Sequence, residues 1–204
     1  YVDRVAEGTG RHTWRAEDLV ELKRQLDGMD VARCVIAALR NEPAAVCYQL
    51  EHSSVFWSSG GTSPMDWIWP RGWTYQNLAV YVDVYFSRLV QLGPADSAIA
   101  PASLKQAQQN ADRFFESRSP YRILAAVAIP NFVKAHLVAA YRQSMVQQAR
   151  IGCALEQYRL AHGDYPATLD ALAPQFLPKI TDDSVNGSPF RYHRLPGGTY
   201  QLYS

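Results

Sequence analysis

This chain lacks both a long apolar run and an excess of charge of one sign. Its longest apolar stretch, residues 123–133 around Pro130, is far shorter than the roughly 20 residues that a membrane-spanning helix needs. Lysine and arginine number 20 against 19 aspartates and glutamates, a formal net charge of +1, so no strong field attracts nucleic acid. We therefore expect no transmembrane segment in this sequence and no nucleic-acid partner.

Metal-binding and phosphate-binding motifs are missing as well. The three cysteines, Cys34, Cys47 and Cys153, form no C-x-x-C pair, and none of the five histidines stands in an H-E-x-x-H motif. No glycine-rich loop is followed by the lysine of a phosphate-binding loop. We therefore expect no metal site and no cofactor. Cys34 and Cys47 either form a disulfide in an oxidising compartment or are buried free thiols, and both alternatives stay open.

What the chain does contain is ample apolar and aromatic surface. Hydrophobic residues make up 48% of it, with 12 tyrosines and 5 tryptophans, which is enough to build an ordered core. A length of 204 residues suits one domain, or one domain with a small appended module.

Apolar residues recur at helical spacing through most of the sequence. In the first 120 residues this spacing predicts helices at 13–28, 30–50, 74–92 and 101–114. A proline inside a helix removes a hydrogen bond, so we expect a break or kink at Pro43. The longest helical pattern runs from residue 121 to residue 162, where Pro130 either kinks one helix or separates two.

The hydrophobic period changes near the end of the chain. Residues 190–195 and 199–203 alternate in the manner of β-strands, and Pro196-Gly197-Gly198 between them suits a hairpin turn. Two strands alone are only marginally stable, so the hairpin must pack on the long helix. The predicted fold class is mainly α (α+β): a helical N-terminal region plus a long helix packed against a small C-terminal antiparallel β-hairpin.

A family resemblance rests on several segments in the last third of the chain. Residues 123–135 read Ile-Leu-Ala-Ala-Val-Ala-Ile-Pro-Asn-Phe-Val-Lys-Ala, and the segments 154–166, 169–172, 183–192 and 200–204 follow in the family's order. Over about residues 121–204 the chain resembles the major pseudopilins of type II secretion and the type IV pilins. With the preceding helical sequence, it is similar to a group of bacterial envelope proteins. The resemblance implies two domains, a helical region with a Trp-rich loop at 1–120 and a pseudopilin-like module at 121–204.

The chain departs from the pilin pattern in three places. The sequence Phe-Phe-Glu-Ser-Arg-Ser-Pro at 114–120 replaces the processing signature, so we do not expect the helix to be processed or inserted as a pilin. Gln201 replaces the first aspartate of the calcium loop, so the segment ending at Ser204 should not bind calcium by itself. About 120 residues precede the module without a pilin counterpart, which argues against assembly into a fibre.

The resemblance leads to a functional expectation. It implies a non-enzymatic structural or interaction protein of the bacterial cell envelope, whose partner is another protein or a second copy of the chain. It also implies a periplasmic location, or a membrane anchor upstream of Tyr1 that leaves the chain facing the periplasm.

Tryptophan is concentrated in one segment. Trp57, Trp67, Trp69 and Trp73 account for four of the five tryptophans in the chain. Aromatic faces stack on sugars, so a second hypothesis makes this segment a binding module for polysaccharide or peptidoglycan. The alternative is that these rings attach an irregular loop to the helices, which is the commoner use of large aromatic side chains.

Two further groups of residues suggest chemistry. Glu51-His52-Ser53-Ser54 places a base beside hydroxyl groups, so a third hypothesis is a hydrolase centred on His52, although no G-x-S-x-G motif accompanies it. Asp182-Asp183 could pair as carboxylates for acid–base work, but their Pro- and Gly-flanked position favours a turn.

Overall fold

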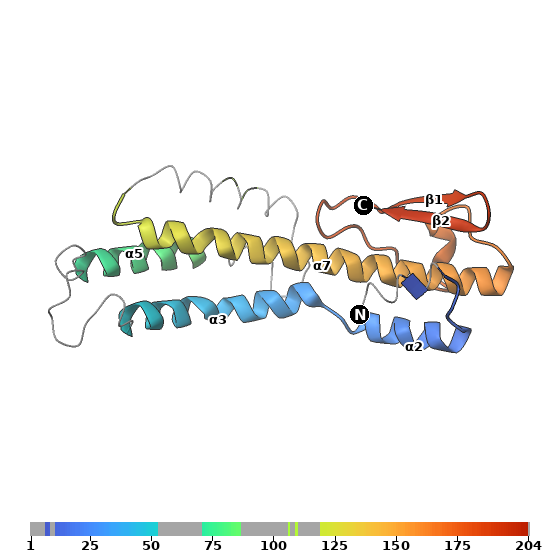
Figure 1. Cartoon of the computed structure of the whole chain (residues 1–204), viewed down its shortest axis with the longest axis horizontal. Helices are drawn as coiled ribbons and strands as arrows, with labels where there is room; N and C mark the ends of the chain where they lie inside the picture. Colours follow the sequence, from blue (N-terminus) through green and yellow to red (C-terminus); the bar gives the residue numbers. More distant parts are fainter. Residues whose placement is uncertain are drawn as a thin grey trace. The chain divides into compact units, whose positions relative to one another are not determined.

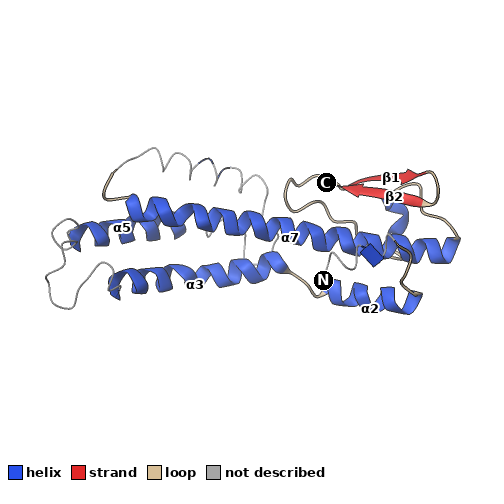
Figure 2. Cartoon of the chain, viewed as in Figure 1, coloured by secondary structure: helices blue, strands red, loops and turns tan. Residues whose placement is uncertain are grey.

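The computed structural model describes residues 7–8, 11–52, 71–86, 106, 109 and 119–203. In chain order its elements are α2 (Ala16–Asp27), α3 (Val31–His52), α5 (Arg71–Val84), α7 (Ile123–His162), the 3-10 helix η3 (Leu169–Leu172), β1 (Arg191–Leu195) and β2 (Thr199–Tyr203). Figures 1 and 2 show these helices and the antiparallel pair of strands. The predicted fold class, mainly helical with a long helix and a small C-terminal hairpin, is confirmed. None of the described helices is both long and apolar enough to cross a membrane.

The chain forms two compact units. One consists of Tyr1–Val31 together with Ala140–Ser204, and the other of Ala32–Ala139. This division by contacts falls inside α7, so each unit contains part of the long helix. The domain boundary predicted at residue 120 is based on the sequence pattern and not on contacts, and it stays a prediction.

In the unit formed by Ala32–Ala139, the core is built around two tyrosines, Tyr81 of α5 and Tyr85 just after the end of that helix. Tyr81 and Tyr85 are almost fully buried with Val133 of α7, and Leu39 and Val46 of α3 pack against them. The Tyr85 hydroxyl donates a hydrogen bond to the carbonyl oxygen of Leu39. These contacts join α3, α5 and the first part of α7.

Pro43 and Pro130 both lie inside continuous helices. We expected either a break or a kink at Pro43; the break is absent, because α3 runs without interruption from Val31 to His52, and the kink stays a prediction. Leu39 and Val46, on either side of Pro43, pack against the same tyrosine cluster, so tertiary contacts hold the helix together across the missing hydrogen bond. α7 likewise includes Pro130, so the alternative of two separate helices is wrong.

In the other unit, α2 packs along the later part of α7. Leu19 and Leu26 of α2 are fully buried against Val146, Ala149 and Cys153 of α7. Leu19 and Leu26 are seven residues apart, or two helical turns, and the three residues of α7 recur at spacings of three and four, so each set lies on one helical face. An ion pair of 2.5 Å between Arg150 and Asp27 adds a polar contact at the C-terminal end of α2.

The hairpin of the same unit lies against α7 through a second apolar cluster. Its centre contains the buried residues Ile151, Ala154, Leu155, Tyr165, Leu169, Leu172, Leu177 and Phe190. From the hairpin, Tyr192, Tyr200 and Leu202 pack onto this cluster. The helix therefore supports the hairpin, as the sequence predicts.

The strand register follows from the turn between the strands. Arg191 pairs with Tyr203 at one end of the ladder and Leu195 with Thr199 at the other. Gly197 and Gly198 have φ values of +90° and +72°, a left-handed conformation that glycine adopts at little cost. This turn fixes which side chains face α7, because a shift by one residue would exchange the two faces.

The cysteines form no disulfide. All three are free, with Cys34 exposed, Cys47 half-buried and Cys153 buried. Cys34 and Cys47 lie thirteen residues apart on α3, which separates them by about 20 Å along the helix axis. A disulfide needs Cα atoms within about 7 Å, so the bridging alternative is wrong. The expectation that both thiols are buried is also wrong for Cys34.

We predict that the three thiols react at very different rates. Burial raises the pKa of the Cys153 thiol to about 12, so only about one molecule in ten thousand carries the reactive thiolate at pH 8. Burial, assisted by the charge of Glu51, also raises the pKa of Cys47. Titration of the folded protein with a thiol reagent should modify Cys34 first, Cys47 more slowly, and Cys153 only after denaturant is added. Rapid modification of Cys153 in the native protein would contradict the described packing of α2 on α7.

The contact between α7 and the hairpin predicts a large difference between two leucines of the same helix. Leu155→Ala should lower the free energy of unfolding by about 2–5 kcal/mol, because it leaves a cavity under the hairpin. Leu160→Ala is the control, since Leu160 is 46% exposed, and its effect should stay below about 0.5 kcal/mol. Urea denaturation followed by circular dichroism measures both, and equal effects would refute the packing described here.

Candidate functional site

Only one of the four tryptophans proposed as a binding surface lies among the described residues. Trp57, Trp67 and Trp69 fall outside them. Trp73 belongs to α5 and is half-buried, with its ring edge-on to Tyr121 at 5.8 Å. Its carbonyl oxygen accepts a hydrogen bond of 2.7 Å from the side-chain amide of Asn77. Trp73 therefore makes packing contacts, and the binding role of the cluster as a whole stays a prediction.

His52 lies in the last turn of α3. It is exposed, its Nδ1 is 2.9 Å from the carbonyl oxygen of Tyr48, and its ring stacks on that of Tyr48. His162 repeats the arrangement at the end of α7, with Nδ1 3.0 Å from the carbonyl oxygen of Tyr158. A histidine so placed complements the negative end of the helix dipole. Ser53 and Ser54 lie outside the described residues, so the hydrolase hypothesis stays a prediction.

The neighbouring aspartates Asp182 and Asp183 differ in burial and in hydrogen bonding. Asp183 is buried, and its Oδ1 accepts a hydrogen bond of 3.0 Å from the backbone N–H of Val185. Its carbonyl oxygen accepts another, of 2.8 Å, from Gly187. Asp182 is exposed. This is the geometry of the turn that the sequence favours, and it does not resemble a pair of catalytic carboxylates.

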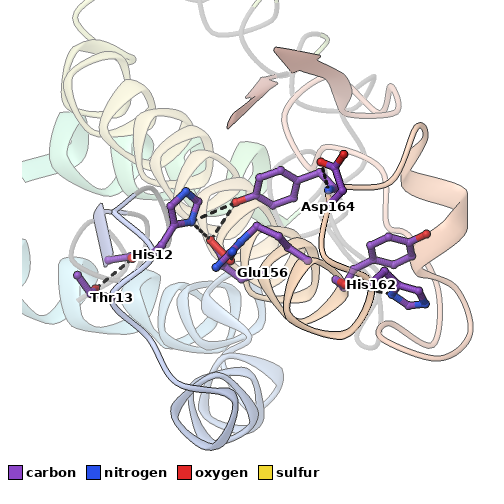
Figure 3. Close-up of polar contacts among 9 residues, drawn as sticks. His12, Thr13, Glu156, His162 and Asp164 are labelled. Carbon is purple, nitrogen blue, oxygen red and sulfur yellow. Dashed lines mark hydrogen bonds and ion pairs between the residues drawn. The ribbon is translucent and has the colours of Figure 1, made fainter. Parts of the chain in front are cut away.

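The most densely connected polar cluster was not predicted from the sequence. Glu156, on α7, is only 2% exposed and is surrounded by hydrogen-bond donors (Figure 3). Its Oε1 lies 2.5 Å from Nδ1 of His12 and accepts a hydrogen bond of 2.9 Å from the Tyr165 hydroxyl. Its Oε2 accepts one of 2.7 Å from Nε of Arg159. We call these four residues the Glu156 cluster.

Three separate parts of the chain bring the Glu156 cluster together. Glu156 and Arg159 are three residues apart on α7, the spacing that places two side chains side by side on a helix. α7 ends just before Gly163, whose φ of +84° turns the chain so that Tyr165 returns to the helix. His12 comes from the segment before α2 and has a φ of +55°, which is unusual for a residue other than glycine.

The segment that carries His12 is itself closely packed. Both the backbone N–H and the hydroxyl of Thr13 donate to the carbonyl oxygen of Gly8, each at 3.1 Å. A Cβ atom at Gly8 would come within 2.2 Å of the Trp14 ring, so only glycine fits there. This small loop presents the His12 ring to Glu156.

The charges of the cluster are arranged to compensate one another. A carboxylate buried to this extent is costly unless it is paired and hydrogen-bonded, and Glu156 has three donors. Burial, and then the hydrogen bond to Glu156, raises the pKa of Tyr165, so the phenol keeps its proton and remains a donor. The hydrogen bond to Glu156 also raises the pKa of Arg159, which stays charged. The cluster is thus a buried carboxylate with both oxygens hydrogen-bonded, one of them in an ion pair with Arg159.

The chemistry available to this cluster is limited. A carboxylate that orients a histidine is one half of a nucleophile-activating arrangement, which also needs a hydroxyl or thiol at the histidine. The Tyr165 hydroxyl lies 3.4 Å from Nδ1 of His12 but donates to Glu156, and no serine, threonine or cysteine is hydrogen-bonded to His12 in the part of the chain that the structure describes. Nor do three or more His, Cys, Asp or Glu residues gather as metal ligands within the described segments. The geometry therefore supports a structural role, in which the cluster attaches the segment before α2 to α7.

Comparison of the chain with protein-family models, with curated proteins and with solved structures finds no match. The resemblance to pseudopilins therefore stays a prediction that rests on the quoted segments.

Glu156→Gln provides a direct test of the network. The substitution keeps the shape of the side chain but removes the buried charge that pairs with Arg159 and accepts the contact from His12, so it should lower the free energy of unfolding by about 3 kcal/mol. Chemical denaturation at pH 7 measures the change.

The matched control is Glu21→Gln, because Glu21 and Arg24 form the same kind of pair three residues apart on α2, but in an exposed position. Arg24 and Gln25 lower the pKa of Glu21 to about 2, yet solvent screens this pair, and its loss should not change the unfolding midpoint measurably. Similar destabilisation by the two substitutions would contradict the role assigned to the Glu156 cluster.

Proposed function

We propose that this protein is a non-enzymatic structural or interaction protein of the bacterial cell envelope, with a pseudopilin-like module in its last third. The observation that carries the proposal is the seating of the hairpin on the buried face of α7 around Leu155. The resembling segments also imply a particular order of elements, and the described residues have that order. It is a long helix, a short helical segment around Leu169, a turn at Asp183 and a closing hairpin.

The polar residues of the same unit support a role without chemistry. Both carboxylate oxygens of Glu156 accept hydrogen bonds that attach segments within the chain, and Asp183 shapes a backbone turn. With its polar groups used inside the unit, the protein acts through its surface, so its partner is another protein or a second copy of itself. We place it in the periplasm, or at the membrane facing the periplasm.

Cell fractionation tests the location. The natural gene, with a C-terminal epitope tag and its own expression signals, should give a product that is released with the periplasm or digested by protease added to spheroplasts. A cytoplasmic protein and a periplasmic protein of the same bacterium serve as the two controls. Recovery of the tagged protein with the cytoplasmic control, protected from protease, would refute the proposed location and with it the envelope function.

Glycan binding is the second candidate, favoured by the density of tryptophan between residues 57 and 73. A glycan array should detect binding that is lost in Trp67→Ala and Trp69→Ala. Trp73→Ala is the informative comparison, because the Trp73 ring packs on Tyr121 and its loss should reduce stability instead. Binding lost only in the first two variants would favour this candidate over the non-binding role.

A further inference from the structure

The hairpin has two chemically different faces. Tyr192 and Arg194 of β1, with Tyr200 and Leu202 of β2, lie on the face toward α7. On that face Arg194 is already engaged, with Asp164 and with the carbonyl oxygen of Tyr165. The opposite face, which we call the outer face, consists of the cross-strand pairs Arg191–Tyr203, His193–Gln201 and Leu195–Thr199.

The outer face is exposed and contains no acidic residue. Five of its six residues are exposed, and Tyr203 is half-buried. The Arg191 guanidinium lies 5.9 Å from the centre of the Tyr203 ring, and the His193 ring lies 6.0 Å from it. Arg191 makes no ion pair within the described residues, in contrast to Arg194. At the other end of the face, Leu195 is 41% exposed.

We propose that the outer face binds an extended acidic segment of a partner protein, with a carboxylate of the partner on Arg191 and an apolar side chain on Leu195. This inference rests on the proposed role in protein contacts and names the chemistry of the partner. Arginine binds carboxylates through two parallel hydrogen bonds, and the Arg191 guanidinium is available for them because it pairs with no acidic side chain among the described residues.

The spacing of the two contact points defines the partner further. Arg191 and Leu195 are four residues apart on one strand, or about 13 Å at about 3.3 Å per residue. An extended partner segment spans the same distance with an acidic residue and an apolar residue separated by three others, the pattern [Asp/Glu]-x-x-x-apolar. Gln201, between the two points, offers an amide to the partner's backbone or polar side chains.

A protein segment fits this face better than a sugar chain does. Sugars stack on an open aromatic face, whereas the Tyr203 ring already has the Arg191 and His193 side chains beside it. The exposed Leu195 is an aliphatic contact that a peptide side chain matches and that a polyhydroxylated sugar does not. Tyrosine and arginine are also the residues that dominate binding energy at protein interfaces.

The test is a titration of the isotope-labelled full chain with short peptides, followed by amide chemical shifts. The probe is acetyl-Glu-Thr-Ser-Thr-Leu-amide, and its controls replace Glu by Lys or Leu by Ser. We expect the probe to shift the amides of residues 191–195 and 199–203, and each control peptide to bind at least about fivefold more weakly. The shifts should also diminish as salt is raised, because the contact is between exposed charges.

Substitutions in the protein identify the residue responsible. Arg191→Glu should remove binding of the probe and give measurable binding of the Lys peptide, whereas Lys179→Gln, which removes an exposed cation elsewhere in the same unit, should leave binding unchanged. Because the Arg191 side chain is exposed, its variant should retain the wild-type unfolding midpoint.

The inference is overturned if the probe shifts no amides of the hairpin, if the Lys peptide binds as well as the Glu peptide, or if an oligomer of galacturonic acid binds in an Arg191-dependent manner while the peptides do not. Fractionation of the tagged protein decides the envelope function independently, so failure of one proposal is distinguishable from failure of the other.

Discussion

The described unit that contains the hairpin depends on one interface, the contact of residues 151–155 of α7 with the chain that follows the helix. Two antiparallel strands alone are at best marginally stable in water, because their ladder buries too little apolar surface. The side chains of Ile151 and Leu155 provide that surface, and Leu172 and Phe190 close it from the other side. The turn sets the strand register, and this contact holds the resulting inner face on α7, so the outer face is turned away from the helix.

Polar contacts give the interface its specificity. Apolar packing alone would tolerate several arrangements of the segments around α7. Glu156, one residue beyond Leu155, is stable inside only when His12, Arg159 and Tyr165 all reach it. The network therefore selects one arrangement of the N-terminal segment and of the residues after the helix, at the cost of burying a charge.

The sequence predicts the elements better than it predicts the contacts between distant residues. The long helix and the hairpin were predictable because their hydrophobic periods are clear and a Pro-Gly-Gly turn separates the strands. Of the break or kink expected at Pro43, the break is absent, because a local rule cannot include the tyrosine cluster that Leu39 and Val46 contact on either side of the proline. The Glu156 cluster was missed because His12 and Glu156 are 144 residues apart in the sequence. The one signal that could have indicated it was the acidic residue Glu156 in the otherwise apolar helical stretch 151–156, all of which the structure buries.

The attachment of His12 has a mechanical consequence. Glu156 is six residues from the last residue of α7, so the N-terminal segment meets the helix close to its C-terminal end. If a force pulled on the chain ahead of Glu7, the His12–Glu156 pair would transmit it to α7 first. The leucines of α2 would be loaded only after that pair had broken. A tether joined there would therefore load the half of α7 that supports the strands.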